Sequence, residues 1–209
     1  MSGQNTGQAS AAETVVYSRR REKSEATRQR ACEAATAHLA AFGYHRTSIG
    51  KIAERAGVSQ GALQHHFPAK DDLIVAVIDY LLARSVAWFA IARIDLARGP
   101  DAFGEVVRRS WREQFLSDDY AAILEILAAS RTDGALKARI APALERWRTM
   151  IDAELTALLP STTRTAKELD AILSISRAMM TGLVVHDRLL KDDAHIDFVI
   201  DQWIEMARR

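Results

Sequence analysis

The sequence predicts an all-α protein, and three observations support this prediction. The 10 Gly and 4 Pro make up about 7 % of the 209 residues, whereas soluble proteins average roughly 12 %, so turn-rich β-sandwiches and barrels are disfavoured. Apolar residues recur at helical spacing along most of the chain, and no segment alternates apolar and polar residues as a half-buried strand does. Apolar residues also make up 48 % of the chain, which is enough for a folded core.

The chain is expected to begin with a lead-in and one long helix. Residues 1–18 are rich in Gly, Ser, Gln, Thr and Ala, which predicts a disordered tail. The pattern becomes helical from about Ser24, and Gly43 provides the stop. The apolar residues of this helix follow the spacing of one buried face: Ala31, Ala35, Leu39 and Phe42.

Two short helices follow, joined by a glycine turn. Ser48 is an N-cap signal for the first of them, and Gly57 closes it. Ser59 caps the second, which ends before Pro68. Two short helices around a glycine turn, followed by a proline stop, predict a helix-turn-helix.

The rest of the chain predicts six longer helices. Their expected spans are 71–96, 101–116, 118–131, 134–159, 165–190 and 194–207. Pro142 is expected to kink the fourth of them or restart it. Together with the first long helix and the two short helices, this gives about nine helices.

The net charge of +1 hides an asymmetry. Residues 1–70 carry a net charge of +5, and residues 71–209 carry −4. A basic N-terminal part suits a polyanion such as DNA. We therefore divide the chain into a tail (1–18), a helix-turn-helix part suited to DNA (19–70) and a mildly acidic C-terminal part (71–209).

The second short helix has two different faces. Leu63 and Phe67 lie on the side that can pack against the preceding helices. The opposite side carries amide, imidazole and bare backbone, through Gln60, Gly61, Gln64 and His65. A major groove admits one helix and is read by such short polar groups. Helix N-termini and nearby cations would bind the phosphates.

Residues 47–63 and 65–73 resemble the DNA-binding signature of TetR-type transcriptional regulators, and the likeness extends over roughly residues 25–85. It implies a homodimeric regulator, usually a repressor, that leaves its operator when a small molecule binds the C-terminal domain. It also implies phosphate contacts at Thr47 and Lys70. The family most often has Tyr where Gln64 stands, so Gln64 is left open as a base or a phosphate contact. The DNA-binding set is Arg46, Thr47, Ser48, Lys51, Ser59, Gln60, Gly61, Ala62, Gln64, His65 and Lys70.

The C-terminal part supplies candidates for a ligand pocket and a dimer interface. Aromatic and Met residues in the middle helices can line a pocket, although residues at such spacing can equally be plain core. The ligand candidates are Trp88, Phe89, Trp111, Phe115, Trp147, Met150, Met179 and His186. The last two long helices have broad apolar faces that predict a four-helix dimer interface. That interface would comprise Leu169, Leu173, Met180, Leu183, Ile196, Val199, Ile200 and Trp203.

Other function classes find little support in the sequence. The single cysteine, Cys32, excludes an internal disulfide. The adjacent pair His65 and His66 has no third ligand nearby, so we expect no metal site and no cofactor. No phosphate-binding loop or hydrolase motif is present, so we expect no enzyme. The longest charge-free apolar runs fall far short of the roughly 20 residues of a membrane span.

These observations predict a cytoplasmic, ligand-responsive repressor. Its partners would be double-stranded DNA with a near-palindromic operator, a second copy of the chain and a small-molecule effector, with no membrane. The run Arg19 to Arg21 is either an arm along DNA or a solubilising tail. The alternative is a small-molecule-binding helical protein without DNA-binding activity.

Overall fold

The computed structural model describes residues 6–99, 101–158 and 162–208, and every regular element in these ranges is helical. The N-terminal elements are α1 (Thr6–Phe42), α2 (Ile49–Ala56), α3 (Gln60–His66) and α4 (Lys70–Leu96). The middle elements are α5 (Asp101–Ser110), the π-helix η1 (Trp111–Phe115), α6 (Asp118–Ser130) and α7 (Gly134–Leu158). The last are α8 (Ala166–Gly182), the π-helix η3 (Leu183–Asp187), α9 (Arg188–Leu190) and α10 (Asp193–Arg208).

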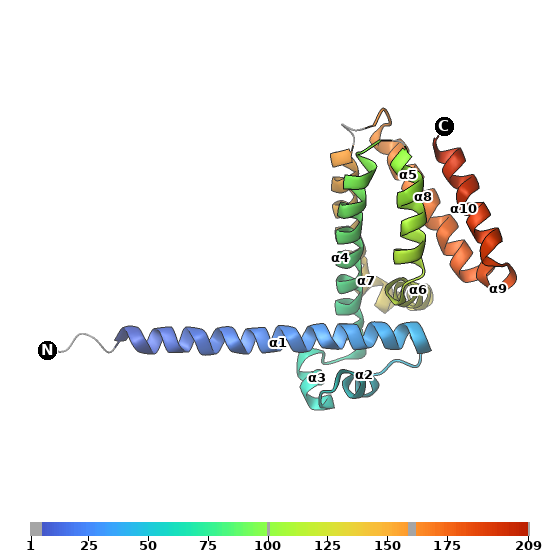
Figure 1. Cartoon of the computed structure of the whole chain (residues 1–209). Coiled ribbons are helices and arrows are strands. Elements are labelled where there is room, and N and C mark those ends of the chain that lie inside the picture. Colours follow the sequence, from blue (N-terminus) through green and yellow to red (C-terminus); the bar gives the residue numbers. More distant parts are fainter. Residues whose placement is uncertain (1–5, 100, 159–161, 209) are drawn as a thin grey trace.

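The predicted all-α class is confirmed. Because α5 runs directly into η1, and α8 into η3 and α9, the described residues form nine continuous helices, as predicted. Figure 1 shows α2 and α3 on one side of α1, with α4 to α10 on the other side. The helix-turn-helix therefore lies at one end of the molecule.

Helix α1 is longer at its N-terminal end than the sequence predicts. A disordered tail was expected over residues 1–18, whereas α1 begins at Thr6, and residues 1–5 lie outside the described ranges. The extension follows a packed helix without a proline, so each added residue propagates an existing helix and needs no new nucleation. Figure 1 shows this half of α1 projecting beyond the other helices.

The largest core joins the helix-turn-helix to the rest of the protein. It contains buried residues of α1, α2 and α3 together with residues of α4, α6 and α7. Burying each such large aliphatic side chain contributes about 1.5–3 kcal/mol. The fully buried large side chains in this core are Leu39, Ile52, Leu63, Phe67, Leu73, Ile74, Ile78, Leu81, Ile126, Leu136 and Ile140. The predicted DNA-binding part is thus packed directly on the C-terminal part.

Helices α4 and α7 run side by side in the same direction. Arg139 pairs with Asp72, and Arg146 pairs with Asp79 at 2.5 Å. Both pairs join residues 67 positions apart, so the two helices advance together and are parallel. Helix α7 contains Pro142 without an interruption, so the predicted restart is absent.

A second, smaller core lies among α5, η1, α8, η3 and α10. Its buried residues are Val107, Trp111, Met180, Leu183, Ile196, Ile200 and Ile204. This core packs three segments against one another: α5 with η1, α8 with η3, and α10.

Two of the described helices, α4 and residues 166–190, are long and apolar enough to cross a membrane by length and composition alone. The sequence analysis expects no such span. For α4 the apolar character has another cause, because Leu73, Ile74 and Val77 lie in the main core. A core helix of a soluble protein passes the same test, so this is weak evidence for a membrane protein.

Cys32 is buried in the main core, and burial raises the pKa of its thiol to about 11. The thiolate is the reactive form, and at pH 8 it should be about 0.1 % of the total, against a substantial fraction for a free cysteine. We expect labelling by a thiol reagent such as DTNB to be at least about 100-fold slower in the native protein than in guanidinium. Equal labelling rates in the two states would contradict this placement of Cys32.

Candidate DNA-binding surface and ligand cavity

Capping interactions fix the two helices of the helix-turn-helix. Ser48 accepts a hydrogen bond from the backbone N–H of Lys51 (3.4 Å), and Ser59 accepts one from that of Ala62 (3.1 Å). Gly57 ends α2 with φ of +65°, a conformation that favours glycine. The turn between α2 and α3 is therefore tight, and both helix starts are defined by their caps.

The inner side of α3 is held by the core and by α1. Leu63 and Phe67 are buried. Arg28 of α1 lies 4.6 Å above the Phe67 ring centroid and donates a hydrogen bond to the carbonyl of His66 (3.3 Å). Desolvation, with smaller effects of His65 and Arg28, lowers the pKa of His66. His66 therefore contributes a neutral, half-buried ring at pH 7.

The outer side of α3 is free. The exposed residues on this side are Gln60, Gly61, Ala62, Gln64 and His65. The space where a side chain would extend from Gly61 is open, so another backbone or a base can approach it closely.

The neighbouring cations of α2 and its preceding loop flank this surface. Arg46 and Lys51 are exposed, and Lys51 Nζ donates to the carbonyl of Arg46 (2.9 Å). Exposed cations beside a protruding polar helix suit the phosphates on either side of a groove.

Thr47 and Lys70 are turned toward the protein instead. The Thr47 hydroxyl is buried and donates to the carbonyl of Gly43 (3.0 Å). Lys70 Nζ donates to the carbonyl of Tyr44 (2.8 Å) and lies 3.7 Å above the Tyr44 ring centroid, and burial lowers the pKa of Lys70. The loop carbonyls need donors, and both side chains hold the loop in this structure. The phosphate contacts that the resemblance implies for these two residues stay a prediction.

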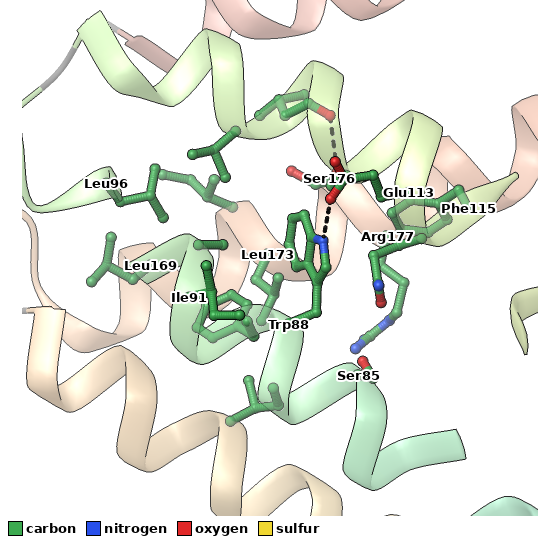
Figure 2. A pocket seen from close by; sticks show the side chains of 18 of the residues that line it. Ser85, Trp88, Ile91, Leu96, Glu113, Phe115, Leu169, Leu173, Ser176 and Arg177 are labelled. Atoms are coloured by element: carbon green, nitrogen blue, oxygen red, sulfur yellow. Dashed lines mark hydrogen bonds between the residues drawn. The ribbon is translucent and has the colours of Figure 1, made fainter. Parts of the chain in front are cut away.

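A cavity of about 1740 Å³ lies in the C-terminal part, between α4, α5, η1, α6, α7 and α8. Four of the predicted ligand residues line it: Trp88, Phe89, Phe115 and Trp147. Trp88 Nε1 donates to Glu113 Oε2 at 2.9 Å, a bond visible in Figure 2. The cavity is larger than the roughly 300–1,000 Å³ of typical ligand sites.

The other four ligand candidates do not line this cavity, so their role in ligand binding stays a prediction. Trp111 belongs to the second core, and Met179 packs against it. Met150 is exposed, and so is His186, whose Nδ1 lies 2.6 Å from Asp187 Oδ1. Helical residues point in directions about 100° apart, so an aromatic or Met residue on a cavity-lining helix need not face the cavity.

Several polar residues of the cavity wall were not predicted from the sequence, among them Arg84, Glu113, Asp119, Tyr120, Ser176 and Arg177. A signal for some of them was present. Arg84 precedes Trp88 by one helical turn, and Ser176 follows Leu173 by three residues, so each pair shares one helix face.

The predicted dimer residues take part in packing within one chain, so their role at an interface stays a prediction. Met180, Leu183, Ile196 and Ile200 are buried in the second core, Val199 and Trp203 pack against it, and Leu169 and Leu173 line the cavity. The same helical segments carry a different set of exposed large apolar residues, which we call the exposed apolar face: Ile175, Val185, Leu189, Leu190, Phe198 and Met206. These helices have two apolar faces, and sequence periodicity does not say which one is covered by the chain itself.

A capped helix-turn-helix with a free polar face, packed on an all-helical domain with a large cavity, defines the class of ligand-responsive helix-turn-helix regulators. Residues 32–77 match the family described as bacterial regulatory proteins, tetR family. The regulator CymR of Pseudomonas putida is 28 % identical over 187 residues, covering 90 % of this chain and 92 % of CymR. BetI of Yersinia pestis (strain Pestoides F) is 44 % identical over 55 residues, which are 26 % of this chain and 28 % of BetI. This chain is therefore similar over most of its length to a helix-turn-helix transcriptional regulator, and its residues 32–77 match the tetR family.

Solved structures agree on the fold. A TetR-family regulator of Mesorhizobium loti superposes with a TM-score of 0.70 at 17 % identity, covering 88 % of this chain and 96 % of that one. FadR of Bacillus subtilis, solved in complex with stearoyl-CoA, gives a TM-score of 0.63 at 19 % identity, covering 86 % and 96 %. The relatives found by sequence are transcriptional regulators and not enzymes.

Proposed function

We propose that this protein is a homodimeric repressor that binds a near-palindromic operator through α3 and leaves it when a small molecule occupies the cavity. One observation carries the proposal. Helix α6 has Ile126 buried in the core shared with the helix-turn-helix, and it lines the cavity with Tyr120, Ile123 and Leu127. A ligand that moves α6 therefore acts on the element that supports the DNA-binding surface.

Dimerisation is proposed through the exposed apolar face of α8 to α10. Large apolar side chains exposed together on neighbouring helices mark interaction sites, and a second copy of the same face gives a closed, symmetric four-helix contact. Two recognition helices related by this two-fold axis would read two half-sites.

In this arrangement the two parts of the chain have different functions. Residues 19–70 would bind DNA, and residues 71–209 would bind the effector and dimerise, although both parts share one core. The proposed partners are double-stranded DNA, a second copy and the effector, without catalytic activity. We place the protein in the cytoplasm, where its operator is.

Direct DNA binding tests the proposal. A duplex selected by the protein from a random pool is titrated with the protein in about 50 mM and 200 mM salt, with a scrambled duplex as control. We expect specific binding that weakens at least about 100-fold between the two salt concentrations, because several phosphate contacts release counterions. No binding even at low salt would favour the alternative, a ligand-binding helical protein that does not contact DNA.

Gln64 is expected to read a base edge. It is exposed on the free side of α3, and a glutamine can pair bidentately with adenine, which contributes about 1–3 kcal/mol of discrimination. Gln64→Ala should weaken binding to the selected operator about 10-fold or more, and change binding to the scrambled duplex less than 2-fold. An equal loss on both duplexes would show that Gln64 contacts only the phosphate backbone.

A further inference from the structure

Among the described residues of the cavity wall, one arginine has neither an ion pair nor a hydrogen bond from its guanidinium. The wall contains four arginines and three carboxylates. Arg84 pairs with Asp119 at 2.6 Å, Arg164 donates to the carbonyl of Ala207, and Arg208 lies 3.7 Å from Glu205. Among the described residues that line the cavity, Arg177 is the cation with neither an ion pair nor a hydrogen bond from its guanidinium.

The acidic residues of the wall are already engaged. Glu113 accepts the indole N–H of Trp88, and Glu168 accepts the backbone N–H of Thr165 (2.8 Å) as part of a capping box. Neither carboxylate is paired with Arg177. Among the described residues, no carboxylate of the wall therefore forms an ion pair with Arg177.

Trp147 adds an unsatisfied donor to this wall, whereas the hydroxyl of Tyr120 is already engaged. Thr181 donates its hydroxyl proton to the carbonyl of Arg177 (2.7 Å), so in the 2.5 Å contact between the Tyr120 and Thr181 hydroxyls Tyr120 is the donor. The indole N–H of Trp147 is buried and has no acceptor among the described residues. The Arg177 guanidinium lies 5.5 Å from the Trp147 ring centroid. The Arg177 guanidinium and the Trp147 indole N–H are thus two donors of this wall without an acceptor among the described residues.

Polar and apolar side chains are segregated along the cavity. Figure 2 shows Leu96, Leu169 and Ile91 on one side of Trp88, and Arg177, Ser85, Glu113 and Phe115 on the other side. A ligand that fills both sides needs an apolar body and one polar head. Because Arg177 is exposed, an entering ligand can reach its charge.

We infer that the cavity takes an elongated, apolar monoanion whose carboxylate is bound by Arg177 and whose body lies along Trp88 toward Leu169. A guanidinium binds a carboxylate through two parallel N–H donors, and the aromatic wall buries the body of the ligand. This inference rests on the proposed function only in naming the cavity as the effector site. It assigns to Arg177 the preference of the cavity for an anionic ligand over a neutral or cationic one.

Three probes with one apolar body test the inference: biphenyl-4-carboxylate, biphenyl-4-carboxamide and biphenyl-4-ylmethylamine. Binding to the full chain, without DNA, is measured by calorimetry and by quenching of tryptophan fluorescence. We expect the carboxylate to bind at least about 10-fold more tightly than the neutral amide, since a charge-assisted hydrogen bond is stronger than a neutral one. The amine should bind most weakly.

Variants then assign the preference to Arg177. Arg177→Gln should bind carboxylate and amide within 2-fold of each other and keep the wild-type affinity for the amide. Arg148→Gln is the matched control, because Arg148 lies on α7 with a side chain 77 % exposed and does not line the cavity. This control should keep the full preference.

Several results would overturn the inference: equal affinity of the wild type for carboxylate and amide, tightest binding of the amine, an unchanged preference in Arg177→Gln, or no binding of any probe at 1 mM. A failure of the proposed function would look different. In that case the carboxylate would bind with the expected preference, while the selected duplex would not bind or would not be released.

Discussion

Phe198→Lys is expected to convert the dimer to a monomer and to weaken operator binding at least about 100-fold. Phe198 lies on α10 and is 60 % exposed in the single chain, within the exposed apolar face. A lysine there would place two like charges near the two-fold axis of a desolvated interface. A monomer also loses the high effective concentration that joins two half-sites. Sedimentation and operator titration measure the two effects.

The matched control is Ile94→Lys. Ile94 is a large apolar residue with a similar exposed fraction, 56 %, but it lies on α4 and outside the exposed apolar face. This variant should remain a dimer and keep its operator affinity. If Phe198→Lys sedimented as a dimer at micromolar concentration, or if both variants became monomers, the proposed interface would be wrong.

Local signals made the DNA-binding end of the molecule predictable. The caps at Ser48 and Ser59 and the positive φ of Gly57 depend on a few neighbouring residues, and each leaves a mark in the sequence. The outward residues of α3 followed from helical geometry for the same reason. The orientation of Thr47 and Lys70 could not be predicted in this way. Their partners are loop carbonyls whose positions depend on how α1, α2 and α4 pack together.

The C-terminal half was predictable in its helices but not in its faces. Helix spans depend on periodicity and caps, and they came close to the observed bounds. Whether Met180 or Ile175 faces the chain's own core depends on the packing of α8 against α5 and α10, which periodicity does not specify. The cavity presents the same difficulty, because the unpaired state of Arg177 appears only once the partners of the other arginines are known.

Glu125 provides a direct link between the cavity helix and the DNA-binding end. Its Oε2 accepts the backbone N–H of Tyr44 at 3.0 Å, at the start of the loop that leads into α2. A Cβ at Gly43 (φ of +78°) would come within 2.9 Å of the same oxygen, so the loop and the carboxylate are in close contact. Helix α6 carries Tyr120 and Leu127 on the cavity wall. Movement of α6 should therefore reach the loop through Glu125.

We expect Glu125→Ala to weaken the coupling between the two sites more than it weakens either site alone. Coupling between sites is reciprocal and typically amounts to about 5–150-fold, so operator DNA should lower the affinity of the wild type for biphenyl-4-carboxylate by such a factor. In Glu125→Ala this factor should fall below about 5, while the affinity for the probe without DNA stays within 2-fold. Glu105→Ala is the control, because Glu105 is an exposed acid on α5, a helix that contributes no described residue to the core around α2 and α3. An undiminished factor in Glu125→Ala would mean that the signal travels through the apolar core around Ile126 and not through the hydrogen bond to Tyr44.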